Sequence, residues 1–317
     1  MKRLTWSALV VLFLSFHTFS WAQEAKKVKV KTDLGKIYGS LLTTEKKKES
    51  PIVIIIPGSG PTDRDGNSVL VQTNNYKLLA EGLLKEGISS LRYDKLMVGK
   101  SEATIEEKDL KFEDNVTIVN AWIDYLNAKK FENIILIGHS EGSLIGMLAA
   151  QTGKVNKYIS IAGTGRTIDK VLIEQLNDQT PSIISEVREI FKKLKKGKKA
   201  TNVSPELAGL FRPSVQPYLI SWLKFDPKEE IGKVRIPTLI VHGSTDIQVT
   251  EEDAHLQYGG SKSAELVIID GMNHIFKEAP MNKEKNTETY YKPGLPLHPE
   301  LLPTLVTFIK KSEASKD

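Results

Sequence analysis

Cysteine is absent from all 317 residues of the chain. This absence excludes disulfide bonds, thiol chemistry and zinc sites built on cysteine, so a hydrophobic core must provide the stability. The sequence also lacks a His-Glu-x-x-His motif or any similar spacing of metal ligands. We therefore do not expect a catalytic metal.

Strong net charge and a long apolar run are missing as well. The formal net charge is only +5, which gives no reason to expect a nucleic-acid partner. The apolar stretch over residues 8–19 is shorter than the roughly 20 residues that a membrane-spanning helix needs. Because basic residues precede this stretch and the small residues Ser20 and Ala22 follow it, we interpret residues 1–22 as an export signal cleaved after Ala22. An uncleaved membrane anchor is the alternative.

If the signal is cleaved, the mature protein is expected to be secreted or periplasmic, without stable insertion in a membrane. Its pattern of strands and helices predicts an α/β fold with a mostly parallel, doubly wound sheet. A stretch of alternating apolar and polar residues near the start, "KVKVKTDLGKIYGSLLTT", predicts an antiparallel hairpin at a sheet edge. Short apolar runs typical of buried parallel strands follow. They are "PIVIIIPG", "ISSLRYD", "NIILIGHS", "KYISIAG", "IPTLIVHGSTD" and "AELVIIDGMNH".

Helical patterns occupy the segments between these runs, over about residues 76–85, 112–129 and 142–150, and a last helix is expected over 299–310. The alternation lapses after "KYISIAG", where a helix-like and lysine-rich segment begins. This lapse predicts one α/β core interrupted by a helical cap. The expected boundaries are residues 23–163 and 236–317 for the core and residues 164–235 for the cap.

Three aromatic residues of the predicted cap, Phe211, Tyr218 and Trp222, are candidates for binding substrate. They recur at spacings that suit the roof of a pocket over the carboxyl ends of the strands. The alternative is that they pack the small core of the cap itself. An apolar roof of this kind favours small apolar ligand groups.

Ser140 is the candidate nucleophile. It lies in the motif Gly-His-Ser-Glu-Gly between a strand-like run and a helix-like run, where Gly138 and Gly142 leave room for a tight turn. Asp246 and His274 each follow a later strand-like run, so the chain order is Ser, Asp, His. This order and placement predict a triad in which His274 takes the serine proton and Asp246 orients the imidazole.

Acyl transfer also needs hydrogen-bond donors for the tetrahedral oxyanion. We assign these donors to the backbone N–H groups of Glu141 and Ser59. The loop that contains Ser59, "PGSGPTDRDGNS", lacks the Gly-Lys-Ser/Thr ending of a phosphate-binding loop, so nucleotide binding is not expected.

Other polar residues near these motifs are interpreted as structural. His139 and His242 lie in strand-to-turn segments and are expected to pack or form structural hydrogen bonds. Asp63, Arg64 and Asp65 are expected to form a salt bridge contained within their own loop.

The segments "GHSEGS", "HGSTDIQV", "GMNH" and "PGSGPTDRDGN" resemble the α/β-hydrolase superfamily, and more narrowly a secreted bacterial branch close to cinnamoyl-esterase-like and serine-aminopeptidase-like hydrolases. The resemblance implies cleavage of carboxylic esters by the Ser-His-Asp triad without a cofactor. One departure is visible, because Leu96 and Met97 stand where relatives usually have an Arg-Gly pair. This departure bears on substrate preference.

The sequence therefore predicts a secreted serine hydrolase, and specifically a carboxylesterase that acts on small esters through an acyl-serine intermediate. An aminopeptidase-type peptidase, a thioesterase and an acyltransferase share the same triad chemistry and remain alternatives. A different class of function is an inactive binding protein on a hydrolase fold.

Overall fold

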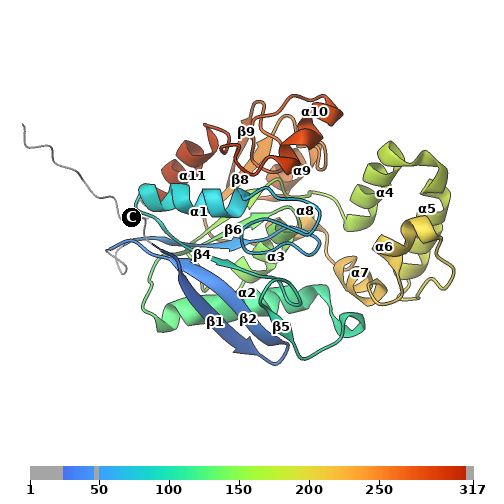
Figure 1. The fold of residues 1–317 in the computed structure, drawn as a ribbon, viewed down its shortest axis with the longest axis horizontal. Helices are drawn as coiled ribbons and strands as arrows, with labels where there is room; N and C mark the ends of the chain where they lie inside the picture. The colour runs from blue at the N-terminus through green and yellow to red at the C-terminus, as the bar shows by residue number, and fades with distance from the viewer. Residues whose placement is uncertain (1–23, 46–49, 312–317) are drawn as a thin grey trace, which may run out of the picture.

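A computed structural model of the chain describes residues 24–45 and 50–311 (Figure 1). The predicted export signal lies outside the described residues. Within them, no helix is both long enough and apolar enough to cross a membrane.

One nine-stranded sheet forms the centre of the molecule, with the order β1-β2-β4-β3-β6-β7-β8-β9 and with β5 paired to β2. Along the main path, β4, β3, β6, β7, β8 and β9 run parallel to one another, whereas the β1–β2 and β2–β4 pairs are antiparallel. The strands are β1 (Lys26–Thr32), β2 (Gly35–Leu42), β3 (Ile52–Ile56), β4 (Ser89–Tyr93), β5 (Glu102–Ala103), β6 (Ile134–His139), β7 (Lys157–Ile161), β8 (Thr238–Gly243) and β9 (Ala264–Ile269).

The sequence pattern of each strand follows from its surroundings. All five residues of β3 are buried apolar side chains, because helices cover both faces of the parallel part of the sheet. Along β1, buried and exposed side chains alternate, because this hairpin forms the edge of the sheet. The predicted hairpin and the predicted parallel sheet are both confirmed.

Helices cover the two faces of the sheet, as expected for a doubly wound fold. One face packs against α1 (Asn75–Lys85) and α11 (Leu301–Lys310), which also contact each other. The other face packs against α2 (Phe112–Ala128), α3 (Glu141–Ala150), α8 (Pro227–Ile231) and α9 (Glu251–Gly260). Figure 1 shows α1 and α11 on the side of the sheet opposite α2.

The segment between β7 and β8 forms α4 (Ile168–Gln179), α5 (Ile184–Leu194), α6 (Ala208–Phe211) and α7 (Gln216–Trp222). We call these four helices the helical insertion. They lie together to one side of the sheet in Figure 1. Helix α8, which ends the predicted cap segment, instead contacts α3 and α9 of the core.

A second segment of irregular structure separates β9 from α11. It contains α10 (Lys283–Glu288) and a short 3-10 helix, η4 (Thr289–Tyr291). No sequence pattern predicted these two elements. They lie beside the loop that carries His274, and their side chains form hydrogen bonds with that loop.

Candidate active site

Ser140 occupies a sharp turn between β6 and α3. Its backbone has φ 54° and ψ −120°, a strained conformation for a residue with a side chain. A Cβ atom on Gly138 would lie 2.2 Å from the Gly142 carbonyl oxygen, and one on Gly142 would lie 2.4 Å from the Ile56 carbonyl oxygen. Both positions therefore need glycine, and the turn presents Ser140 at the carboxyl end of the sheet.

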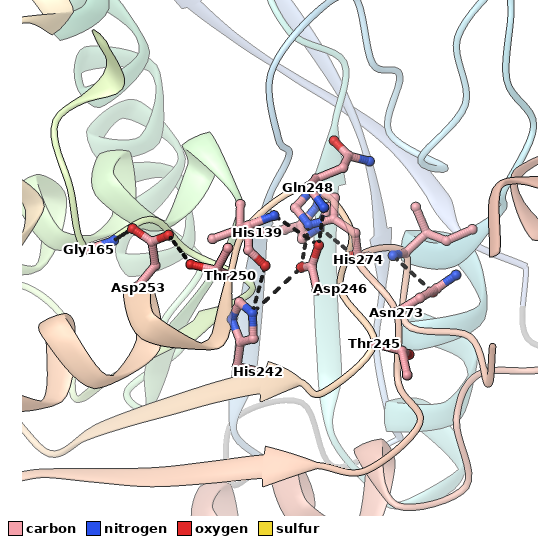
Figure 2. A network of polar contacts seen from close by, with 12 residues as sticks. His139, Gly165, His242, Thr245, Asp246, Gln248, Thr250, Asp253, Asn273 and His274 are labelled. Atoms are coloured by element: carbon pink, nitrogen blue, oxygen red, sulfur yellow. Dashed lines mark hydrogen bonds and ion pairs between the residues drawn. The ribbon is translucent and has the colours of Figure 1, made fainter. Parts of the chain in front are cut away.

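His274 and Asp246 form a buried pair at the ends of β9 and β8. His274 Nδ1 lies 2.7 Å from Asp246 Oδ2 (Figure 2). Burial acts to raise the pKa of Asp246, but the charge and hydrogen bond of His274 leave this pKa below its ordinary value. Asp246 Oδ1 accepts hydrogen bonds from the backbone N–H groups of Gln248 and Val249. The ionised carboxylate is thus held in place and fixes the histidine with Nδ1 as the donor.

The pair lies next to the strand end that carries Ser140. His139, the residue before Ser140, has its ring centroid 4.7 Å from that of His274. Its Nε2 donates a 2.9 Å hydrogen bond to the His274 carbonyl oxygen. Within residues 24–45 and 50–311, no hydrogen bond joins Ser140 directly to His274. Catalytic hydrogen bonds are often long in sites without substrate, and they shorten when substrate binds.

His139 is structural, as the sequence indicated. Burial, together with the nearby His274, lowers the pKa of His139 to about 3, so the ring is neutral near neutral pH. Its Nδ1 accepts a 2.7 Å hydrogen bond from the Tyr76 hydroxyl, which itself accepts the Gly58 N–H at 2.9 Å. These bonds connect the loop after β3 to the histidine loop.

His242 is also buried and structural. Its Nε2 donates to the Val249 carbonyl oxygen at 3.0 Å and lies 3.9 Å from Asp246 Oδ2. Burial lowers the pKa of His242, against the opposing effect of Asp246. This ring therefore supports the segment that positions the Asp246 carboxylate.

A buried amide network joins the aspartate and histidine loops, and the sequence analysis did not identify it. Asn286 of α10 donates to the carbonyl oxygen of Thr245 at 2.8 Å, next to Asp246. It accepts a 3.1 Å hydrogen bond from Asn273, which precedes His274 and also donates to Thr289 at 2.8 Å. No sequence pattern pointed to this network, because its members are separated in the chain and lie in irregular segments.

The two proposed oxyanion donors lie beside Ser140, since Ser59 and Glu141 line the same cavity as the serine. A Cβ on Gly58 would lie 3.2 Å from the Ser140 Cβ, so the loop backbone passes close to the nucleophile. No hydrogen bond from the Ser59 N–H is present within the described chain. Glu141 is the first residue of α3, where backbone N–H groups have no partner inside the helix.

The loop after β3 is tied to the end of β4, and this corrects one expectation. Arg64 binds Asp94 at 2.5 Å, and Asp65 pairs with Arg92. The predicted salt bridge contained within residues 63–65 is therefore wrong. Both charged side chains instead reach strand β4 and its exit, because those partners are buried and oppositely charged.

A cavity of about 600 Å³ separates Ser140 from the helical insertion. Most of its lining is apolar, and Tyr218 and Trp222 contribute to it. Phe211 does not, which corrects the prediction for this residue. Its ring is fully buried and packs edge-on against Phe191, 5.2 Å between centroids, in the core of the helical insertion.

Met97 lies at the cavity mouth and has a left-handed backbone, with φ 64°. Glycine adopts this conformation readily, which fits the glycine that relatives usually have at this position. Here the position carries an apolar side chain that is 42% exposed, next to the buried Leu96. Both side chains line the apolar cavity.

In the part of the chain that the structure covers, no three His, Cys, Asp or Glu side chains are grouped to hold a metal ion.

Comparisons with known proteins support the fold. The model of a family described as "alpha/beta hydrolase fold" matches residues 51–201. Esterase EstD from Thermotoga maritima is 28% identical over 233 residues, a match that spans 71% of this chain but only 54% of EstD.

Two solved structures share the fold at low identity. Est1E from Butyrivibrio proteoclasticus, with ferulic acid bound, has a TM-score of 0.56 at 23% identity and covers 83% of this chain and 94% of its own. The α/β hydrolase GrgF from Penicillium sp. sh18 has a TM-score of 0.60 at 18% identity. The match covers 90% of this chain and 98% of GrgF. With its parallel sheet, its serine turn and these matches, the chain has the α/β-hydrolase fold.

Proposed function

We propose that this protein is a serine hydrolase, and specifically a carboxylesterase that acts through an acyl-Ser140 intermediate. The observation that carries this proposal is the buried pair of His274 and Asp246, 2.7 Å apart, beside the strained turn of Ser140. A histidine oriented by a carboxylate, beside a serine that lines a cavity, is the arrangement that activates a hydroxyl nucleophile.

The reaction follows from the roles of these groups. Ser140 Oγ attacks the ester carbonyl carbon while its proton moves to His274 Nε2, and the negative charge of Asp246 stabilises the imidazolium. The backbone N–H groups of Ser59 and Glu141 bind the oxyanion. The tetrahedral intermediate expels the alcohol, which takes the proton from His274. Water then attacks the acyl carbon while His274 takes its proton. The acid leaves, and His274 returns this proton to Ser140 Oγ.

The cavity supports small esters with an apolar acyl or aryl group. Its lining is mostly apolar, and Tyr218 and Trp222 supply aromatic surface to the cavity that Ser140 also lines. The related esterase EstD and the ferulic acid bound to Est1E point to the same substrate class. We further propose that the helical insertion acts as a cap that selects the substrate and supplies no chemistry.

The carboxylates of the cavity do not favour an aminopeptidase. A free N-terminal amine would need an available carboxylate, but the cavity-lining acids Glu107 and Glu141 are paired with Arg212 and Lys95. Among the described lining residues, no carboxylate is left to bind such an amine.

The test is a panel of p-nitrophenyl and feruloyl esters, with thioesters and aminoacyl anilides included. We expect ester hydrolysis in the wild type and a loss of about 10⁴-fold or more in kcat for a folded Ser140→Ala variant. Retention of more than a few per cent of the activity by this variant would overturn the assignment of the nucleophile. Faster turnover of the anilides than of the esters would replace the esterase with a peptidase.

Export is a separate proposal. We propose that residues 1–22 are an export signal and that the Ala22–Gln23 bond is cleaved, which places the mature enzyme in the periplasm or outside the cell. N-terminal sequencing of protein from an exporting host tests this, and a mature chain that starts at Met1 would contradict it.

A further inference from the structure

Lys95 has no role in the triad, yet its ammonium group lies inside the site. It follows β4 in the chain and is largely buried, with 12% of its side chain exposed. Its Nζ donates two hydrogen bonds, to Glu141 Oε2 at 2.9 Å and to the Gly58 carbonyl oxygen at 3.1 Å. Both partners neighbour Ser140, because Glu141 follows it in the chain and Gly58 lies against its Cβ.

The Gly58 carbonyl belongs to the same peptide group as the Ser59 N–H. A peptide group is planar, so holding its oxygen also fixes the direction of its N–H. A cation on the oxygen also polarises the peptide and makes the N–H a stronger donor. The Gly58 N–H is bound separately by the Tyr76 hydroxyl at 2.9 Å, so the loop is held on both sides of Gly58.

The second proposed donor is held through the same ion pair. Glu141 supplies its backbone N–H to the oxyanion site, and its side chain, only 2% exposed, binds Lys95. Its other oxygen, Oε1, accepts a hydrogen bond from the hydroxyl of Tyr218 in α7. The Tyr218 hydroxyl also accepts a 3.0 Å hydrogen bond from Asn115. The helical insertion therefore contacts the residue that carries one of the two donors.

We propose that Lys95 is a positioning residue for the oxyanion site, and that its ion pair with Glu141 aligns the N–H groups of Ser59 and Glu141. The inference rests on the proposed esterase function. Lys95 does not take part in proton transfer. It acts through the two backbone donors and so stabilises the transition state more than the bound substrate.

The test must separate positioning from folding. Lys95→Met alone leaves the Glu141 carboxylate buried without its partner, which is strongly destabilising. The decisive variant is therefore Lys95→Met/Glu141→Gln, which removes both charges and keeps an acceptor for Tyr218. Lys95→Arg keeps a cation, and Lys100→Met is the matched control, since Lys100 is exposed and lies outside the cavity lining.

We expect the double variant to lose about 10- to 100-fold in kcat, less than the full loss of one oxyanion donor, with KM changed by no more than about twofold. Its inhibition constant for a trifluoromethyl ketone, which forms a tetrahedral adduct with serine, should rise by the same factor. The affinity for the product acid should stay constant. Lys95→Arg should recover part of the loss, and Lys100→Met should match the wild type.

A double variant that keeps wild-type kcat and ketone affinity would overturn the proposal, and so would a loss confined to KM. Failure of this proposal is distinguishable from failure of the esterase function. If Ser140→Ala is inactive and the double variant is fully active, only the role of Lys95 is wrong. If Ser140→Ala retains ester hydrolysis, the proposed function is wrong.

Discussion

Two buried aspartates, Asp246 and Asp253, follow β8. The contacts of each carboxylate show that Asp246 is the one that binds His274. Asp246 binds His274, whereas Asp253 accepts a 2.9 Å hydrogen bond from the backbone N–H of Gly165 (Figure 2). Asp253 also binds Arg166 at 2.7 Å. Their similar burial makes them a matched pair for substitution.

Asp246→Asn should lower kcat by about 10⁴-fold, because an amide in this place favours the wrong histidine tautomer. Asp253→Asn should lower the melting temperature, since it weakens a buried ion pair, yet leave kcat of the folded protein within a few-fold of the wild type. Ester kinetics together with thermal unfolding of both variants check this. An active Asp246→Asn with an inactive Asp253→Asn would assign the triad acid to Asp253.

The positions of individual site residues could be predicted from the sequence where those residues lie at strand ends. Ser140, Asp246 and His274 each follow a readable apolar run, so their convergence could be predicted from the parallel sheet. Lys95 also follows such a run, and this position was the available signal for it. Its contact with the Gly58 carbonyl depends on loop geometry that no sequence pattern encodes.

The aromatic residues of the helical insertion have two different roles. Some line the cavity, and others pack the core of the insertion. Trp222 lines the cavity and stacks on Phe112 of α2, with 5.1 Å between ring centroids. Phe211 is buried against Phe191 and does not reach the cavity. Both are large aromatic residues of the same insertion, so the sequence alone could not distinguish these two roles.

Trp222→Ala should change the order of preference for acyl chain length, because it enlarges the cavity opposite Ser140. Phe211→Ala should cost about 3–5 kcal/mol of stability through the space left in the core, and leave the acyl preference of the folded protein unchanged. Denaturant unfolding and kcat/KM across an acyl-length series measure the two effects. A changed acyl preference in Phe211→Ala alone would contradict the assignment of these roles.

The elements themselves were predictable to different degrees. The parallel strands and the main helices of the core follow from hydrophobic patterns, which their burial on one or two faces imposes. Helix α10 was not predicted, because its six residues, "KEKNTE", are mostly polar and carry no apolar stripe. Its Asn286 is nevertheless fully buried and joins the loops of Asp246 and His274.

For the whole molecule, buried titratable groups make stability depend on pH. The pKa of His139 falls to about 3 in the folded protein, against an ordinary value of about 6.5. Between these values the unfolded chain binds more protons, so stability is full above about pH 6.5 and is lost as the pH falls toward 3. Asp246, whose folded pKa is depressed, contributes stability above about pH 3.9 that is lost as the pH falls through its folded pKa.

We therefore expect the free energy of unfolding to fall as the pH drops from 7 to 4. A His139→Gln variant should show a shallower dependence over this range, whereas His255→Gln, at an exposed position, should match the wild type. Urea unfolding at a series of pH values measures this. Equal slopes in the wild type and in His139→Gln would show that the folded protein does not hold this ring neutral.

Covalent labelling can show whether Ser140 is the nucleophile. The wild-type protein is treated with a fluorophosphonate and the modified peptide is identified by mass spectrometry. We expect one adduct per chain, on Ser140, and a strong decrease of labelling in Asp246→Asn. An adduct on another serine, or no adduct on a folded chain that hydrolyses esters, would contradict it.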